Sequence, residues 1–516
     1  MAGDERTHLL ANGHRSAGQA RIKTTVVAAS KTFSLANRVL LAGLLMSFTL
    51  GITQVPILYV FRLMECDIFY SHNPQLLGSA DERCHRPEID AGTALRFSVL
   101  GVSISPSGVF NLFVCGYFIK MWGPRWSFVS QASLLGLRVS TQIIGVAVGG
   151  RTGELIFQIG QAIGVIGGPR GYQLVLNTVV SKAVAAKDRT AAFGRLQGAI
   201  MLGTAFGYLC SPFEIAFFLF VISTVYGALF LHTEASTEIL GQKQSHHGLD
   251  GFFAPLKVIV PRRYRLPSGK VIKSYGLVFL ALGIFLGVLG SGYAPILQIY
   301  ATSAFHFNTT ENGYLMFGIS LVHGLFLFFL FTKIIAKGRL WFRGTIQQDQ
   351  RTEHHDNGDG RLPTTPVEFP VAEGVGVAQE PVQSPDADEE DLGTGFDLLF
   401  VRWSLVVDSL VTLFARFLLP FASGSAPAAR GVMTALCPPH QRPDAIGAIT
   451  LVESTAMLVT QGLFGLIFAA FSDMGKPSLT FFCNAGIAVL GFIVLFATRL
   501  PPANSKRIAD DETRAD

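Results

Sequence analysis

Charged and amide side chains lie inside long apolar stretches of this chain, and they are the residues best placed to do chemistry. A charge near the middle of a lipid bilayer costs roughly 3 kcal/mol or more, so each must face a cavity or a partner. Arginines in a cavity would bind a carboxylate through paired N–H groups, and amide or phenol groups would hydrogen-bond or stack on a substrate. The candidate substrate-binding residues are Gln54, Arg138, Arg170, Gln173, Tyr293, Gln298 and Arg430.

Three further residues in these stretches could carry a proton. Proton-driven transport needs a carboxylate or an imidazole whose proton affinity changes as the group is alternately buried and wetted. The candidates for proton coupling are Asp408, Glu453 and His323. Two structural alternatives remain open, because Arg430 could pair with Glu453 and only brace the helices, and Arg138 could pair with Asp408.

The chain that holds these residues has the composition of a membrane protein. Its 516 residues are 49% hydrophobic and 15% charged, whereas an average soluble domain is about 25% charged. The six cysteines are too sparse for a disulfide scaffold, and a net charge of +5 with basic residues spread between apolar runs argues against nucleic-acid binding. We therefore predict a polytopic protein whose partners include membrane lipid and no nucleic acid.

Apolar runs of about 20 residues, long enough to cross a membrane, recur along the whole sequence. They predict an all-α membrane protein with twelve transmembrane helices in two six-helix, pseudo-repeated halves. The first six spans are expected near 39–61, 95–118, 126–149, 154–181, 194–212 and 213–232, and the second six near 274–300, 314–335, 398–416, 418–437, 446–471 and 478–498. Spans nine and ten are compressed, so a single tilted helix with a re-entrant piece is the alternative there.

Lys and Arg gather in the loops on the side of the N-terminus, which predicts cytoplasmic termini in a cell membrane. Basic residues at 262–265 could contact anionic lipid headgroups, and the alternative is that they only reflect the cytoplasmic excess of Lys and Arg. The expected divisions are a cytoplasmic tail (1–37), a first half (38–232), a cytoplasmic central loop (233–273), a second half (274–498) with a disordered acidic cytoplasmic loop (340–396), and a second tail (499–516).

The loops on the opposite side carry two extracellular features. Cys66 and Cys84 lie in the first outward loop, where they could form a disulfide, with two free thiols as the alternative. Asn308 begins an Asn-Thr-Thr acceptor for N-glycosylation in another outward loop. Both features fit the predicted orientation.

The two halves repeat a short pattern. Leu50-Gly51 precedes Pro56-Ile57-Leu58 by the same spacing with which Leu289-Gly290 precedes Pro295-Ile296-Leu297. Duplicated six-span halves define one transporter architecture, in which the substrate binds near the midplane between the halves.

With this duplication the chain resembles the major facilitator superfamily. Gly194 after Lys187-Asp188-Arg189 resembles the family's loop after the fourth span, and Arg442 with Gly447 repeats it in the second half. The run from Ala426 to Ser454 resembles a group of fungal members that are distantly similar to proton-coupled folate transporters. The resemblance implies that spans 1, 4, 7 and 10 line a cavity. It implies gating by Gly116, Lys120, Gly123, Arg125, Arg189 and Arg442.

One loop departs from the family pattern. The loop between the second and third spans usually reads Gly-x-x-x-Asp-Arg-x-Gly-Arg, and here Lys120 and Met121 replace the acidic residue and the first arginine. In the family that acidic residue helps to hold the inward gate closed. Its replacement motivates a rival hypothesis, a non-transporting sensor or scaffold on a degenerate transporter fold.

Motifs of ATP hydrolysis and of enzymes are missing from the sequence, including Gly-Lys-Ser/Thr, Gly-x-Ser-x-Gly and His-Glu-x-x-His. We expect neither an enzyme nor a bound cofactor or metal. The sequence and the resemblance predict a monomeric secondary active transporter that moves a small organic molecule, with anions among the candidates, by alternating access. Proton-coupled efflux of a fungal secondary metabolite is the leading expectation, and import of an organic anion is the alternative.

Overall fold

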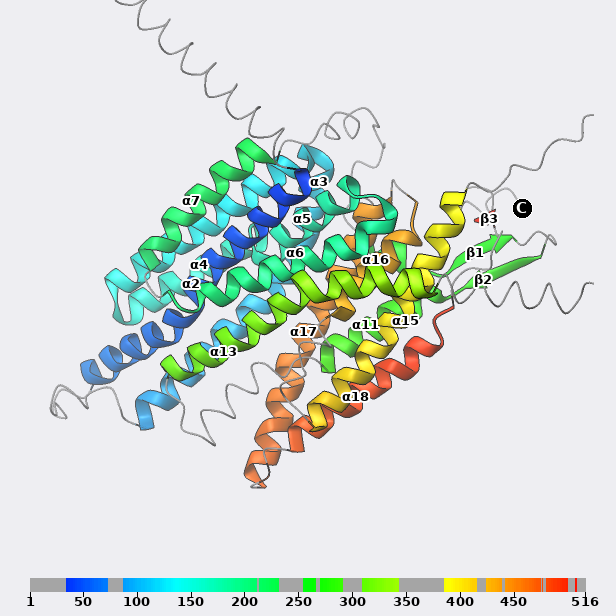
Figure 1. Ribbon diagram of the computed structural model, residues 1–516. Helices are drawn as coiled ribbons and strands as arrows, with labels where there is room; N and C mark the ends of the chain where they lie inside the picture. Colours follow the sequence, from blue (N-terminus) through cyan, green and yellow to red (C-terminus); the bar gives the residue numbers. More distant parts are fainter. Residues whose placement is uncertain are drawn as a thin grey trace, which may run out of the picture.

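The computed structural model describes residues 34–72, 87–210, 213–231, 254–265, 270–290, 309–342, 385–414, 424–438, 441–474, 476, 479–499 and 506–507. Within these ranges the chain is helical apart from short connections and one small sheet (Figure 1). The first half contains α2 (Leu35–His72), α3 (Pro87–Val148), α4 (Gly150–Ile166), α5 (Pro169–Ala183), α6 (Ala186–Gly207) and α7 (Phe213–Phe230). The second half contains α11 (Gly276–Gly290), α13 (Thr309–Leu325) continued by the π-helix η2 (Phe326–Phe331), α15 (Pro385–Phe414), α16 (Ser425–Ala435), α17 (Arg442–Asp473) and α18 (Leu479–Phe496).

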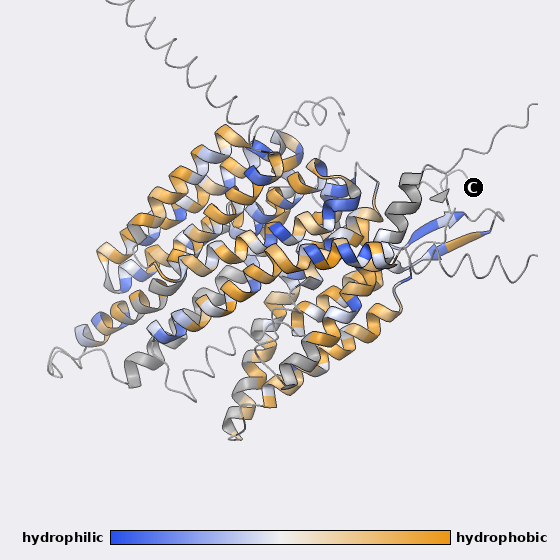
Figure 2. Cartoon of the chain, viewed as in Figure 1, coloured by the Kyte–Doolittle hydropathy of each residue, from blue (hydrophilic) through white to orange (hydrophobic). Residues whose placement is uncertain are grey.

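The helices have the length and surface of membrane spans. By length and composition, four described segments could each cross a bilayer, namely Leu35–Thr53, Pro106–Val148, Thr310–Phe342 and Leu479–Phe496. Hydrophobic residues predominate along the helices (Figure 2), and many large apolar side chains are exposed, among them Phe218 and Leu466 at 65% and 75%. Lipid would cover such side chains, so the chain is a multi-pass membrane protein consistent with the twelve predicted spans.

Each half has its own hydrophobic core. The core of the first half is built around residues such as Phe128, Phe193 and Phe220, and the core of the second half around Phe331 and Leu495. The first core also takes in Ile446 and Leu451 of α17. This helix therefore belongs to the second half by connectivity but packs into the first.

Helix α3 contains the second and third predicted spans. Gly123 interrupts its helical geometry with φ 77° and ψ 168°, a left-handed conformation that favours glycine. Arg125 anchors the turn, because its Nε donates a hydrogen bond of 2.9 Å to the carbonyl of Ala228 at the end of α7.

The fourth span, expected as one helix over 154–181, is broken in its middle. Gly167 and Gly168 have extended backbones between α4 and α5, and Pro169 is the first residue of α5. Glycine and proline together disfavour a continuous helix, because glycine costs backbone entropy and proline lacks the N–H that the preceding turn needs. The prediction of an unbroken span was wrong at this point.

The predicted acidic loop over 340–396 is helical at both ends. The helix of α13 and η2 continues to Phe342, and α15 begins at Pro385. The rings of Phe342 and Phe396 lie 6.2 Å apart, so apolar packing orders these ends despite their acidic surroundings. Residues 343–384 lie outside the described residues.

A three-stranded sheet lies at one end of the bundle, next to the short helix α10 (Ala254–Ile259). Strands β1 (Arg262–Arg265), β2 (Val271–Ser274) and β3 (Lys506–Arg507) pair antiparallel in the order β2-β1-β3. Arg262 donates from Nη1 to the carbonyl of Leu436, at 3.1 Å, and so fastens the sheet to the connection between α16 and α17. We call this end of the molecule, where α2 begins and α18 ends, the sheet end (Figure 1).

Candidate functional site

A cavity of about 400 Å³ lies between α2–α6 of the first half and α17 of the second. Its volume is within the range of small-molecule sites. Polar and charged side chains contribute much of its wall. The polar members are Ser47, Ser107, Arg138, Arg170, Tyr172, Gln173, Thr204, Tyr208 and Ser454.

Two arginines give the cavity a positive wall. None of its described lining residues is acidic. Among the described residues no hydrogen bond or ion pair is seen for the guanidinium group of Arg138, whose Nε is buried without a partner. The Nη2 of Arg170 contacts the thioether sulfur of Met457, which cannot neutralise a guanidinium. An anion in the cavity would supply hydrogen-bond acceptors to both side chains and a negative charge beside them.

The break in the fourth span positions Arg170. Asn111 and Gln131, both fully buried, donate to the carbonyl of Ile166 at 2.9 Å and 3.0 Å. Their own carbonyl oxygens accept hydrogen bonds from the backbone N–H groups of Gly171, at 2.7 Å, and Gly168, at 2.9 Å. Irregular backbone at membrane depth needs such partners. The two amides therefore hold α5 so that its first turn, including Arg170, borders the cavity.

A buried ion pair adjoins the cavity. Nη2 of Arg430 on α16 lies 2.7 Å from Oε2 of Glu453 on α17, and both residues are 5% exposed. Nη1 of Arg430 also donates to Oε1 of Gln197 on α6, at 3.3 Å. Oε1 of Glu453 is buried and has no hydrogen-bond partner. Arg170 interacts electrostatically with both members of the pair, so two arginines share one carboxylate.

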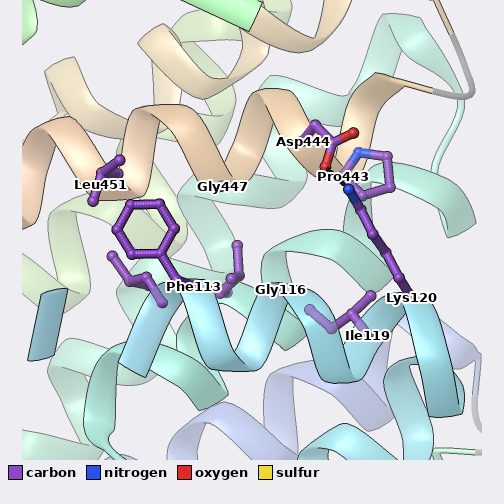
Figure 3. Close-up of a pocket in the computed structure, with 10 residues that line it drawn as sticks. Phe113, Gly116, Ile119, Lys120, Pro443, Asp444, Gly447 and Leu451 are labelled. Carbon is purple, nitrogen blue, oxygen red and sulfur yellow. Dashed lines mark ion pairs between the residues drawn. The ribbon is translucent and has the colours of Figure 1, made fainter. Parts of the chain in front are cut away.

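The halves meet at the sheet end in two polar contacts. In the first, which we call the Lys120 contact, Nζ of Lys120 on α3 lies 2.7 Å from Oδ1 of Asp444 on α17 (Figure 3). Phe113, Gly116 and Leu451 line the same small pocket as the ion pair (Figure 3). Although Lys120 stands where the family pattern has an acidic residue, it joins the two halves through this ion pair.

The second, which we call the Arg339 contact, joins three residues. Nε of Arg339 donates to Oδ1 of Asp397 on α15 at 3.0 Å, and its Nη2 bonds both Asp397 and, at 2.9 Å, the hydroxyl of Thr190 on α6. Thr190 donates to Oδ2 of Asp397. Burial raises the pKa of Asp397, and the hydrogen bonds from Arg339 and Thr190 oppose that shift. Gly431 allows the close approach, because a Cβ there would lie 1.9 Å from Oγ1 of Thr190.

The structure brings some of the predicted site residues together and separates others. Arg138, Arg170 and Gln173 share the cavity, and Arg430 and Glu453 form the ion pair beside it. His323 is half-buried on α13 and is not among the lining residues. The side chains of Gln54 on α2 and Asp408 on α15 lie outside the described residues, as do Tyr293, Gln298 and Asn308.

The predicted gating residues lie mostly at the sheet end. Gly116 and Lys120 border the Lys120 contact, and Gly123 and Arg125 form the turn within α3. Arg189 is buried at the start of α6, next to Thr190 of the Arg339 contact. Arg442 begins α17 close to Asp444.

Only one of the two cysteines of the predicted disulfide lies within the described residues. Cys66 is disulfide-bonded, and its predicted partner Cys84 lies outside the described residues. The other four cysteines, Cys115, Cys210, Cys437 and Cys483, are free thiols.

Several site residues were not predicted. The amides of Asn111 and Gln131 could have been suspected from the Gly167-Gly168-Pro169 run, because a break in a span requires polar partners nearby. No sequence pattern marks Tyr172 and Tyr208 in the cavity. The sequence also gives no signal for Asp444, Asp397 and Arg339 at the sheet end, because their partners are distant in the sequence.

Comparison with known proteins finds one sequence relative and several solved structures of similar fold. No family model matches the sequence. A protein of Schizosaccharomyces pombe, the uncharacterized membrane protein C14C4.07, is 20% identical over 511 residues, which cover 89% of this chain and 79% of that protein.

Solved structures resemble the chain over nearly its full length. The human organic anion transporter MFSD10 matches with a TM-score of 0.58 and 13% identity, over 89% of this chain and 98% of that one. The proton:xylose symporter XylE, of the major facilitator superfamily, matches with a TM-score of 0.52 and 13% identity, over 89% and 95%. These proteins are transporters and not enzymes. The chain therefore shares the fold of these transporters.

Proposed function

We propose that this protein is a secondary active transporter that carries a small organic anion through the central cavity. The observation that supports this most is the pair of arginines on the cavity wall, Arg138 and Arg170, without a carboxylate partner in the described lining. A guanidinium group without a full counter-charge inside a membrane is costly, and Glu453 is already paired with Arg430, so the retention of both arginines favours an anionic ligand. The likeness to an organic anion transporter agrees with this class of substrate.

Alternating access would use the two polar contacts at the sheet end. Both lie on the same side of the cavity, and Asp444 precedes the cavity residue Ser454 by three turns of α17, about 15 Å along the helix. Separating the halves at these contacts would open the cavity toward the sheet end. The predicted orientation, with cytoplasmic termini in a plasma membrane, would make this the cytoplasmic side.

Glu453 is our candidate for the proton carrier, because it is the carboxylate beside the cavity and one of its oxygens lacks a partner. Asp408 and His323 remain alternatives from the sequence. The resemblance to fungal transporters favours proton-coupled efflux of a secondary metabolite. Uptake of an organic anion is the second possibility, and the sensor or scaffold hypothesis is the third.

Flux measurements in proteoliposomes test the proposal. The purified protein is challenged with sulfonates, dicarboxylates and neutral sugars, and accumulation of each is followed by isotope. We expect transport of anions that falls at least about tenfold in Arg138→Gln and in Arg170→Gln, the loss expected for a charge-assisted hydrogen bond. The matched control is Arg151→Gln, which removes an exposed arginine at the opposite end of the bundle.

Two outcomes would contradict the proposal. Folded protein that moves none of these compounds would support the scaffold hypothesis. Transport of sugars that is unaffected by Arg138→Gln and Arg170→Gln would show that the positive wall does not select the substrate.

A further inference from the structure

The three-stranded sheet has two faces of different character. Successive side chains of a strand lie on opposite faces, and along β1 the buried Arg262 and Tyr264 alternate with exposed residues. Arg262 bonds the connection between α16 and α17, so its face packs on the bundle. The opposite face is exposed, and we call it the outer face. Its described side chains on β1 and β2 are Arg263, Arg265, Val271 and Lys273.

The outer face brings together basic residues from separate segments. Arg263 lies directly opposite Lys273 in the antiparallel register, and Arg265 lies opposite Val271. Side chains opposite each other on one face are about 5 Å apart, and diagonal neighbours are about 8 Å apart. Arg263, Arg265 and Lys273 therefore form one compact patch. Strand β3 adds a further basic residue in register, because Lys506 pairs with Arg265.

The described part of the chain does not neutralise this patch. No hydrogen bond or ion pair is seen for the side chains of Arg263, Arg265 and Lys273 among the described residues. Like charges directly opposite each other destabilise a pair of strands, as Arg263 and Lys273 do here. An anion bound across the two strands would remove this repulsion.

The sheet lies at the level where the helices leave the membrane. Strand β2 ends at Ser274, and the apolar helix α11 begins two residues later at Gly276 (Figure 2). Three tryptophans at the sheet end, Trp122, Trp126 and Trp341, are 48%, 54% and 66% exposed. Tryptophan is enriched at the level of the lipid headgroups. The anions closest to the outer face are therefore those of the lipid itself.

We propose that the outer face binds the headgroup of an anionic phospholipid that carries more than one phosphate. Three positive charges within about 8 Å exceed the charge of a single phosphodiester, and guanidinium groups such as those of Arg263 and Arg265 bind phosphate oxygens in pairs. Val271, which is 48% exposed on the same face, adds an apolar contact. Arg262 takes no part, although it belongs to the same basic run. The proposal does not depend on the substrate or on the direction of transport.

Lipid binding to the purified full-length protein in detergent tests this site. The probe is dioctanoyl phosphatidylinositol bisphosphate, and its Kd is measured by microscale thermophoresis. We expect the double variant Arg263→Gln with Lys273→Gln to weaken binding at least about tenfold, because each basic residue near an anionic surface contributes about fivefold. Arg265→Gln alone should weaken binding about fivefold. The Tm of the double variant without lipid should not fall, because its two side chains are exposed and repel each other.

The matched control is Lys187→Gln with Lys337→Gln. It removes the same net charge from two exposed lysines at the sheet end, and it should leave the Kd unchanged. Equal weakening by the two double variants would overturn the proposal, because it would show a general attraction between a basic end of the molecule and acidic lipid. Absence of binding to the wild type would overturn it as well.

The choice of ligand determines which part of the proposal fails. Equal affinity for dioctanoyl phosphatidylserine would overturn the need for more than one phosphate. Equal affinity for soluble inositol trisphosphate would show that the membrane is not the required source. A peptide that copies the acidic residues 386–391 and binds more tightly than the lipid would assign the outer face to the protein's own acidic run, and would also overturn the proposal.

Discussion

The two polar contacts at the sheet end join the same halves in different ways. In the Lys120 contact the two charges come from different halves, and the side chains are 38% and 21% exposed. In the Arg339 contact both charges come from the second half, and the side chains are 16% and 1% exposed. What the first half adds there is neutral, namely the hydroxyl of Thr190 and the carbonyl of Lys187.

Because of this difference, the free energy needed to separate the two halves is small. Pulling apart a buried ion pair by removing one partner costs about 3–5 kcal/mol, but opening the Arg339 contact leaves Arg339 and Asp397 together. Opening the Lys120 contact does separate two charges, yet both are already partly solvated, and exposed pairs contribute about 0–1 kcal/mol. The buried pair stabilises the second half, and the exposed pair and the hydroxyl hold the halves to each other.

The largest effect should come from Asp397→Ala. It leaves Arg339 buried without its carboxylate, and we expect a loss of about 3–5 kcal/mol in the free energy of unfolding. Denaturation in detergent, followed by circular dichroism, measures this loss. Asp444→Ala is the matched control and should cost no more than about 1 kcal/mol. Equal losses in the two variants would refute the division of roles.

Gly431→Ala should shift the balance between the open and closed arrangements of the two halves. Its effect should not be limited to the stability of the second half. The added Cβ would lie 1.9 Å from Oγ1 of Thr190, so the halves must move apart, at a cost of about 1–3 kcal/mol to the closed arrangement. The ratio of open to closed molecules should rise about 5- to 150-fold. Maleimide labelling of Gly116→Cys reports opening, because Gly116 lines the pocket between the two halves. The substitution is tolerated, since a Cβ at Gly116 meets no atom within 4 Å. Unchanged labelling would show that the Arg339 contact does not hold the halves.

Reversal of one charge in the Lys120 contact should have a smaller effect. Lys120→Asp would face Asp444 with a second carboxylate, and labelling of Gly116→Cys should rise by about fivefold, equivalent to about 1 kcal/mol. Adding Asp444→Lys should restore the original labelling. The family pattern alone suggests the opposite, that Lys120→Asp with Met121→Arg improves closure. An increase in transport by that pair would mean that Asp444 is not the partner that matters.

Raising the salt concentration should have the smallest effect on opening, and it should distinguish the Lys120 contact from the Arg339 contact. At 1 M salt the screening length is about 3 Å, so the exposed Lys120 contact should weaken by a few tenths of a kcal/mol. Labelling of Gly116→Cys should rise slightly in the wild-type background and not at all in Lys120→Gln. A salt effect of the same size in Lys120→Gln would assign it to the Arg339 contact instead.

The sequence predicted the parts of the site that depend on one residue in one span. Arg138, Arg170 and Gln173 were identified because charges and amides are rare in apolar runs, and each lines the cavity. The pairing of Arg430 with Glu453 was foreseen as a bracing alternative to substrate binding, and the ion pair does form. The all-α fold with membrane-spanning helices followed from the length of the apolar runs.

Contacts between distant segments were beyond such reasoning. Lys120 was interpreted as the loss of a gating residue. Its partner Asp444 lies in the other half, and nothing in the sequence indicates that the two residues pair. Asp397 directly precedes the predicted span at 398–416 and had no predicted role, although its carboxylate is 1% exposed and bound to Arg339. The break at Gly167-Gly168 was visible as a glycine pair, but its effect on Arg170 depends on amides from α3.

The small sheet imposes an order on biosynthesis. Strand β1 is made before the second half exists, while β3 consists of Lys506 and Arg507, which leave the ribosome after all the described helices. The central strand therefore has an open edge until the last helix has been inserted. Pairing of Tyr264 and Arg265 with β3, and docking of Arg262 on the connection before α17, can be completed only on a finished second half. The sheet is thus a late assembly step that distinguishes a complete molecule from an interrupted one.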